Sequence, residues 1–421
     1  MELSLIWGAV PDLPAANFCA LSFYLLLAAC LHRPLRHRVL AALSHPVPTT
    51  HTVFSALDAL RGFAAMWVFL GHTYTRVPTL LRDEPDVLRY AMSSGQKAVP
   101  IFCVLTGFLI FRSAQQLNSW PKFTGYARNR VYRIFPLYVF AIILAGVMLV
   151  AGFPQVTAAP LYLFFFELIP LQGIIEAQNY DLLLGHLWSL YVEVEFYILA
   201  PFIVLLTARI AKGGLGILIS SLIAATIYFI FIKEFGGREA QLWIYFIFGI
   251  LASVLVDSFG KRLSPIAGTF ILAAGIILLI IDGIGFDWAS AMTSRVWGVA
   301  GYTVGLGLGT MLIVIGIVTD RFANRLLSFR PFRILGIVSY SLFVLHPFYL
   351  YANFHPLGLV AQNLTQDSFT STSPTMPFAY FVLIFIPGMI FIAMLGYIFI
   401  ERPFLARRSM PGVREAKFAE A

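Results

Sequence analysis

Charged residues are scarce in this chain. They make up 12% of its 421 residues, whereas hydrophobic residues make up 59%. A soluble domain carries about 25% charged residues. The shortage of charge therefore excludes a soluble globular protein and indicates an integral membrane protein, with most of its length in the lipid bilayer.

Cysteine is also scarce. The three cysteines, Cys19, Cys30 and Cys103, all lie in apolar stretches and lack the spacing of metal ligands. We expect them to be small core residues, and we predict neither a metal site nor redox chemistry. No Lys or Arg precedes the first apolar run, so we do not expect a secretory signal peptide.

Basic residues outnumber acidic ones but are dispersed. The formal net charge is +8, yet Lys and Arg lie in short connections between apolar runs. This pattern favours membrane orientation over nucleic-acid binding, so we expect no nucleic-acid partner. The connections between the apolar runs fall alternately on the two sides of a membrane, and the connections of one side hold 22 of the 29 Lys and Arg. The positive-inside rule makes that side cytoplasmic, with the N-terminus outside and the C-terminus in the cytoplasm.

Long apolar runs are what the sequence has in abundance. A helix of about 20 residues crosses the hydrocarbon of a bilayer, so these runs predict an all-α, multi-pass bundle of eleven transmembrane helices. They lie at 11–31, 56–73, 97–115, 132–152, 186–207, 214–232, 240–256, 264–281, 295–318, 334–352 and 377–400. We expect the broken apolar run 160–176 to be re-entrant or interfacial. We predict an extra N-terminal helix and basic connection in 1–54, a ten-helix domain in 55–405 and a cytoplasmic tail in 406–421.

Two ionisable residues share the apolar stretch 56–73. Arg61 and His72 are eleven residues apart, so a helix places them on nearly one face, about 16 Å apart. Ionisable groups in hydrocarbon cost about 2.5–3.5 kcal/mol each, and they usually face the protein interior or a watery cavity. Asp58 can pair with Arg61, and a neutral His72 near the outer face can take a proton from a hydroxyl. The alternative is that Arg61 and His72 only reach the two membrane interfaces.

A second polar group opens the predicted span 186–207. His186 and Glu193 are two helical turns apart and share a face, and we expect a His or Arg to be the partner of the Glu193 carboxylate. His346 falls on the outer half of its own predicted span, so three histidines from separate helices reach one membrane depth. Their spacing does not define a metal site. Trp188 is either part of this site or an interfacial aromatic residue.

A third group is basic. Arg130 and Arg133 share a helix face at the predicted cytoplasmic start of the span 132–152. Guanidinium groups are suited to bidentate phosphate binding. Basic residues at a cytoplasmic helix end also arise from membrane topology and lipid headgroup contact, so this pattern alone leaves both roles open.

Six segments occur in a fixed order along the chain. They are LDALRGFAAMWVFLGH at 57–72, VPIFCVLTGFLIF at 99–111, RNRVYRIFPLY at 128–138, HLWSLYVEVEFYILAP at 186–201, LGIVSYSLFVLHPF at 335–348 and IERPF at 400–404. Together they resemble the acyltransferase-3 family, the membrane O-acyltransferases that modify cell-surface polysaccharides. The resemblance extends over about 55–405, nearly the whole chain.

The resemblance implies roles for particular residues. Arg61 and His72 match the family's Arg-x10-His motif, with His72 as catalytic base. Arg130 and Arg133 match the Arg-x-x-Arg motif associated with acyl-CoA, and Glu193 matches the glutamate of the Trp-Ser-Leu-x-x-Glu segment. The expected catalytic residues are His72 and Glu193, the expected donor-binding residues are Asp58, Arg61, Arg130 and Arg133, and the expected substrate-binding residues are His186, Trp188, Ser189 and His346.

The expected function follows from this resemblance. It is transfer of an acyl group, acetyl being the family's commonest, from cytoplasmic acyl-CoA to a hydroxyl of an extracytoplasmic or lipid-linked saccharide, in the cell inner membrane and without a metal. The expected partners are acyl-CoA, a saccharide or glycolipid acceptor and the lipid bilayer. The acceptor, the acyl group and the oligomeric state stay open. The alternatives are a transporter of a saccharide or lipid-linked precursor and a non-catalytic subunit of an envelope assembly complex.

Overall fold

The computed structural model describes residues 14–43, 52–76, 85–150, 184–210, 242–283, 304–354 and 378–407. Every element in these residues is helical, which confirms the predicted all-α class for this part of the chain. The predicted span 214–232 and the predicted interfacial segment 160–176 lie outside the described residues.

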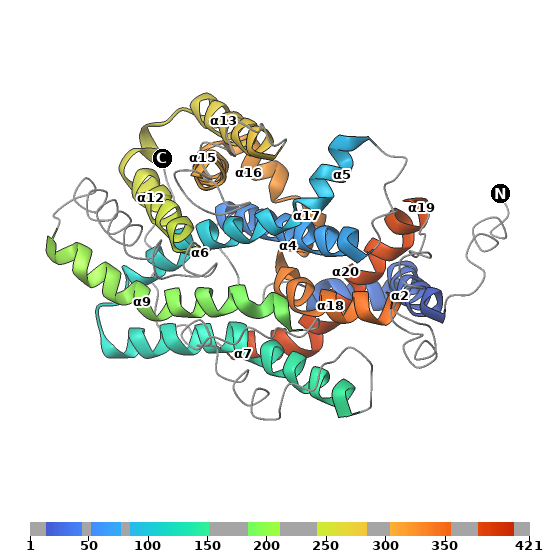
Figure 1. Ribbon diagram of the computed structural model, residues 1–421. Helices are drawn as coiled ribbons and strands as arrows, with labels where there is room; N and C mark the ends of the chain where they lie inside the picture. The colour runs from blue at the N-terminus through green and yellow to red at the C-terminus, as the bar shows by residue number, and fades with distance from the viewer. Residues whose placement is uncertain are drawn as a thin grey trace, which may run out of the picture.

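The helices form one bundle (Figure 1). In chain order they are α2 (Pro14–Leu31), α3 (Arg33–Ala42), α4 (Thr52–Arg76), α5 (Asp86–Ser93), η2 (Gly95–Lys97), α6 (Ala98–Ala114), α7 (Trp120–Val150), η4 (Gly185–Leu187), α9 (Trp188–Ile210), α12 (Trp243–Phe259), η5 (Gly260–Arg262), α13 (Pro265–Gly283), α15 (Val304–Thr319), α16 (Arg321–Leu327), α17 (Arg330–Ile337), α18 (Ser339–Phe354), α19 (Phe378–Tyr380), the π-helical η8 (Phe381–Phe385), α20 (Ile386–Gly396), the π-helical η9 (Tyr397–Glu401) and α21 (Arg402–Leu405). Continuous helices of this kind satisfy the backbone hydrogen bonds that lipid cannot.

Five of the described helical stretches are long and apolar enough to cross a membrane, or up to seven spans if each of two bent pairs is one span. The bent pairs are α15 with α16, at 97°, and α17 with α18, at 66°. These helices support a multi-pass membrane protein. The number of eleven spans and the orientation of the termini stay predictions.

Helix α7 begins earlier than predicted, at Trp120 instead of residue 132. Pro121 occupies its first turn, where the missing N–H of a proline costs no helical hydrogen bond. The arginines of the next turns are good helix formers, so the change from polar to apolar sequence does not mark the start of the helix. Arg130 and Arg133 therefore lie inside a continuous helix and not at its beginning.

Helix α4 lies at the centre of the bundle and contacts α6, α16, α17 and α18 (Figure 1). Two glycines bring it against α17. A Cβ atom on Gly62 would lie 2.7 Å from the backbone nitrogen of Gly336, and a Cβ atom on Gly336 would overlap the Asp58 carbonyl oxygen. Small residues allow this close helix packing in membranes. The approach fixes where Asp58 and its helical turn lie relative to α17.

Helices α13 and α15 pack antiparallel along a glycine-lined contact. Gly268 and Gly275 are seven residues apart on α13, and Gly309 and Gly316 are seven apart on α15, so each pair shares a helix face. A Cβ atom on Gly275 would lie 2.7 Å from the Gly309 carbonyl oxygen. The same pair of helices contacts the rest of the bundle through α12 and α6.

Ion pairs show which helix ends lie together. Lys97, before the start of α6, pairs with Asp282 near the end of α13, with 3.3 Å between Nζ and Oδ2. Arg112, near the other end of α6, pairs with Asp257 on α12, with 2.8 Å between Nη1 and Oδ1. The alternation of the predicted spans places the members of each pair on one side of the membrane, as these contacts require. Which side is cytoplasmic stays a prediction.

Candidate active site

Three histidines meet in the core of the bundle. His72 Nδ1 on α4 lies 3.2 Å from His346 Nε2 on α18, and the two rings are 4.9 Å apart. The ring of His186, on η4, lies 5.0 Å from the ring of His346. The structure thus brings together the three histidines that the sequence placed at one membrane depth, with His346 in the middle.

His346 is fully buried and tightly surrounded. Its Nδ1 lies 2.7 Å from the Phe343 carbonyl oxygen. The rings of Phe343 and Phe69 lie 6.0 and 6.5 Å from the His346 ring. His72 is partly exposed, so it is the member of the pair that a reactant can reach. Close packing of aromatic rings holds the imidazoles in a defined orientation.

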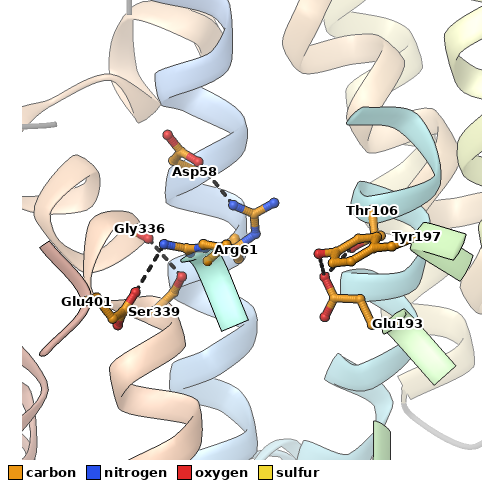
Figure 2. Close-up of polar contacts among 9 residues, drawn as sticks. Asp58, Arg61, Thr106, Glu193, Tyr197, Gly336, Ser339 and Glu401 are labelled. Atoms are coloured by element: carbon orange, nitrogen blue, oxygen red, sulfur yellow. Dashed lines mark hydrogen bonds and ion pairs between the residues drawn. The ribbon is translucent and has the colours of Figure 1, made fainter. Parts of the chain in front are cut away.

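Asp58 and Arg61 lie in the part of α4 that contacts α17, and they form an ion pair (Figure 2). The distance from Arg61 Nη1 to Asp58 Oδ1 is 3.3 Å. The pair is the one expected from their spacing of three residues. Its side chains are 22% and 17% exposed, so the charges are desolvated in part and Arg61 keeps donor groups for a further ligand.

Glu193 has partners that the sequence did not indicate. Its carboxylate accepts hydrogen bonds from Thr106 Oγ1, at 3.1 Å, and from the Tyr197 hydroxyl (Figure 2). The described hydrogen bonds of this carboxylate are therefore with hydroxyls, and the expected His or Arg partner is not among them. Tyr197 lies one helical turn after Glu193, at the spacing that places two side chains on one face. This spacing is the feature of the sequence that could have indicated Tyr197 as a partner of Glu193.

Arg133 and Glu401 form a deeply buried ion pair. Their closest atoms are 3.2 Å apart, and Glu401 has no exposed surface. Ser341 donates a hydrogen bond to the other Glu401 oxygen, and the Arg133 guanidinium lies over the Tyr340 ring at 5.5 Å. The IERPF segment was noted in the sequence only as a matching segment, because nothing in it indicates a partner 268 residues away.

Arg130 lies close to two aromatic rings. Its guanidinium carbon is 5.5 Å from the centre of the Tyr126 ring and 5.5 Å from that of Tyr197. Tyr126 also donates a hydrogen bond of 2.8 Å to the Tyr197 carbonyl oxygen, which joins α7 to α9. Arginine can stack on aromatic faces and still present its planar N–H groups to an anion.

A cavity of about 60 Å³ lies between Arg61, which pairs with Asp58, and the hydrogen-bonded Thr106 and Glu193. Arg61 and Arg133 line it together with Glu193, and Figure 2 shows Arg61 and Glu193 on opposite sides. Its lining residues are Arg61, Val99, Phe102, Cys103, Thr106, Arg133, Ile134, Ser189, Leu190, Glu193, Phe246, Ser339, Tyr340 and Phe343. Of the residues expected to bind substrate, Ser189 lines this cavity, and Trp188 packs against the hydrophobic core.

Phe343 connects the cavity with the histidines. Its ring lines the cavity and lies 5.2 Å from the His186 ring and 5.9 Å from the Phe102 ring. The three histidines themselves do not contribute to the lining of the cavity. The site therefore has a charged compartment and an imidazole compartment, with aromatic side chains between them.

The helices and the buried polar residues define a multi-pass membrane protein with a site inside its bundle. Residues 54–397 match the model of a protein family described as an acyltransferase domain. The match covers most of the chain, and the protein belongs to the acyltransferase-3 family. The family resemblance found in the sequence is thereby confirmed.

Two curated proteins are similar to parts of the chain. One is the "Regulator of hypoxia-inducible factor 1" of Caenorhabditis elegans, which is 26% identical over 191 residues, 41% of this chain and 38% of that protein. The other is "Acyltransferase MdmB" of Streptomyces mycarofaciens, which is 28% identical over 154 residues, 35% of this chain and 38% of that protein. The chain thus spans about two fifths of each relative. No solved structure matches it.

Proposed function

We propose that the protein is a membrane O-acyltransferase of the cell inner membrane. It moves an acyl group, acetyl in the simplest case, from cytoplasmic acyl-CoA to a hydroxyl of an extracytoplasmic or lipid-linked saccharide. The family assignment supports the reaction class. The observation that carries the mechanism is the hydrogen-bonded pair of His72 and His346, 3.2 Å apart in the core of the bundle.

In this proposal His72 is the general base. The hydroxyl oxygen of the acceptor attacks the thioester carbon while His72 takes the hydroxyl proton. The C–S bond breaks, the acyl group stays on the acceptor oxygen, and the thiolate accepts the proton from His72 and leaves as free CoA. Direct transfer balances without a metal or a covalent enzyme intermediate.

The charged compartment is the proposed site of the donor. Arg61 and Arg133 line the cavity, and Arg130 has a planar guanidinium close to two tyrosine rings. Such groups suit the phosphates and the thioester carbonyl oxygen of an acyl-CoA. Glu193, held by Thr106 and Tyr197, is proposed to orient the reacting groups from the other side of the cavity.

The test uses the full chain in proteoliposomes, with acetyl-CoA and an envelope glycan extract as acceptor. We expect release of free CoA in step with the appearance, by mass spectrometry, of an acceptor species heavier by one acetyl group. We expect His72→Ala to lower the rate by about 10²–10⁴-fold, the usual contribution of a general base. His37→Ala is the matched control, because His37 is exposed on α3.

Two outcomes would overturn this proposal. One is unchanged acyl transfer by His72→Ala. The other is movement of the saccharide across the membrane without consumption of acyl-CoA, which would identify a transporter.

A further inference from the structure

We propose that His346 is a positioning residue that fixes the proton of His72 on Nδ1 and so makes Nε2 the base. This inference rests on the proposed function and adds to it the identity of the reacting nitrogen. It also gives His346 a role different from substrate binding, because His346 is fully buried and acts through His72.

The hydrogen bond of His346 with Phe343 determines which atoms donate in the series of hydrogen bonds that joins Phe343, His346 and His72. His346 Nδ1 lies 2.7 Å from the Phe343 carbonyl oxygen. A carbonyl oxygen only accepts hydrogen bonds, so Nδ1 must carry the proton. In a neutral imidazole the other nitrogen is then an acceptor, and His346 Nε2 must accept from His72 Nδ1 at 3.2 Å. His72 therefore holds its own proton on Nδ1, and its basic nitrogen is Nε2.

The local sequence explains why the Phe343 carbonyl can serve His346. In an α-helix the carbonyl of residue 343 accepts from the N–H of residue 347. That residue is Pro347, which lies inside α18 and has no N–H. The carbonyl oxygen is thus released from the helical pattern, and the adjacent His346 side chain uses it. The dipeptide His346-Pro347 contains both the imidazole and the reason for its orientation.

The surroundings favour neutral imidazoles. The titratable groups that face His346 in the described part of the chain are His72 from α4 and His186 from η4, and the aromatic rings of Phe69 and Phe343 also lie beside it. A charged ring without exposed surface would lose its hydration, which is costly. When both rings are neutral, one arrangement satisfies both contacts: His346 Nδ1 donates to the Phe343 carbonyl oxygen, and His72 Nδ1 donates to His346 Nε2.

The test compares two substitutions of His346 in the reconstituted full chain. His346→Gln keeps an acceptor oxygen for His72 Nδ1, whereas His346→Leu fills similar space without one. We expect His346→Leu to lower kcat by about 100-fold with KM for acetyl-CoA unchanged, and His346→Gln to recover about tenfold of that loss. A purely structural role would not give this division between kcat and KM or rescue by the amide.

A double variant separates this inference from the proposed function. If His346 acts only through His72, His346→Leu adds no further loss to the residual rate of His72→Ala. Full activity of His346→Leu, beside an inactive His72→Ala, would overturn the positioning role and leave the proposed function standing. Equal losses in the Leu and Gln variants, together with a lower Tm for both, would also overturn it, because both would then report packing.

Discussion

At the scale of single residues, the most consequential buried charge is Glu401. It is fully buried at the end of η9, where it accepts from Arg133 and Ser341. π-helical turns are rare and frequently occur at functional sites. Removing one partner of a buried ion pair leaves the other charge uncompensated, which costs more than the pair itself contributes.

Glu401→Gln should therefore destabilise the protein. We expect the free energy of unfolding to fall by about 3 kcal/mol, since Arg133 stays partly buried without its counter-ion. Thermal unfolding in detergent micelles measures the change. Asp257→Asn is the matched control, because Asp257 pairs with Arg112 and is 41% exposed, so we expect a cost of about 0–1 kcal/mol. Equal effects of the two substitutions would contradict the prediction.

The two arginines of the Arg-x-x-Arg motif should behave differently. Arg133 forms an ion pair with Glu401, whereas the Arg130 guanidinium contacts tyrosine rings. We expect Arg130→Ala to weaken acetyl-CoA binding by about tenfold with little change of Tm, and Arg133→Ala to lower the Tm as well. Ligand titration beside a thermal melt distinguishes the two effects. Unchanged affinity in the variant lacking both arginines would assign them to topology and packing alone.

The sequence was informative about residues whose partners were close along the chain or lay at the same predicted membrane depth. The spacing of Asp58 and Arg61 predicted their ion pair, and the positions of the histidines in the predicted spans indicated a common membrane depth, at which they do meet. Glu401 was missed because its partner lies on another helix. The expected charged partner of Glu193 was replaced by hydroxyls, since a carboxylate in a bundle can be satisfied by any donor within reach.

At the scale of helices, the contact between α4 and α17 depends on glycine. Gly62 and Gly336 leave no room for a Cβ atom without movement of the backbone of the opposite helix. The pair also determines the position of the charged turn that contains Asp58. Packing of this kind is governed by volume, and added atoms force the helices apart.

Gly62→Ala should consequently lower stability by about 1–3 kcal/mol, because the new methyl group meets the α17 backbone at 2.7 Å. Gly260→Ala provides the comparison, since its Cβ would meet the Val256 side chain at 3.5 Å, an ordinary contact. Thermal melts of both variants check the prediction. If Gly260→Ala were the more harmful of the two, the close contact would not be what limits stability.

Helix boundaries were the less predictable part of the fold. Apolar length marks where a helix crosses hydrocarbon, so the predicted spans 97–115 and 264–281 fall close to the helices of the structure. It does not mark where a helix starts, and α7 extends to Trp120 through basic sequence. Nor does it indicate a bend, and the predicted span 334–352 consists of two helices at 66°.

At the scale of the whole molecule, the ion pairs sort the helix ends into two sets. One set contains Lys97 with Asp282, and the other contains Arg112 with Asp257. The positive-inside rule predicts that the Arg112 set is cytoplasmic. The bundle then has its histidines toward the outer set and its arginine-lined cavity toward the inner one.

Cysteine labelling of intact cells tests this orientation. In a variant without the three native cysteines, Ser93→Cys should react with a membrane-impermeant maleimide, and Ser258→Cys should react only after the membrane is permeabilised. Both serines are exposed, at opposite ends of the described bundle. The reverse labelling pattern would invert the proposed direction of acyl transfer.

Helix α13 touches the bundle along one narrow seam and turns its other sides outward, where Ile266, Phe270 and Ile277 are more than half exposed. Its apolar stretch Pro265–Asp282 is 18 residues long, about 27 Å at the usual rise. That length suits a bilayer slightly thinner than average. The contact with α15 and the Lys97–Asp282 ion pair at one end hold α13 in place, so we expect the thickness of the surrounding bilayer to influence the stability of this helix pair.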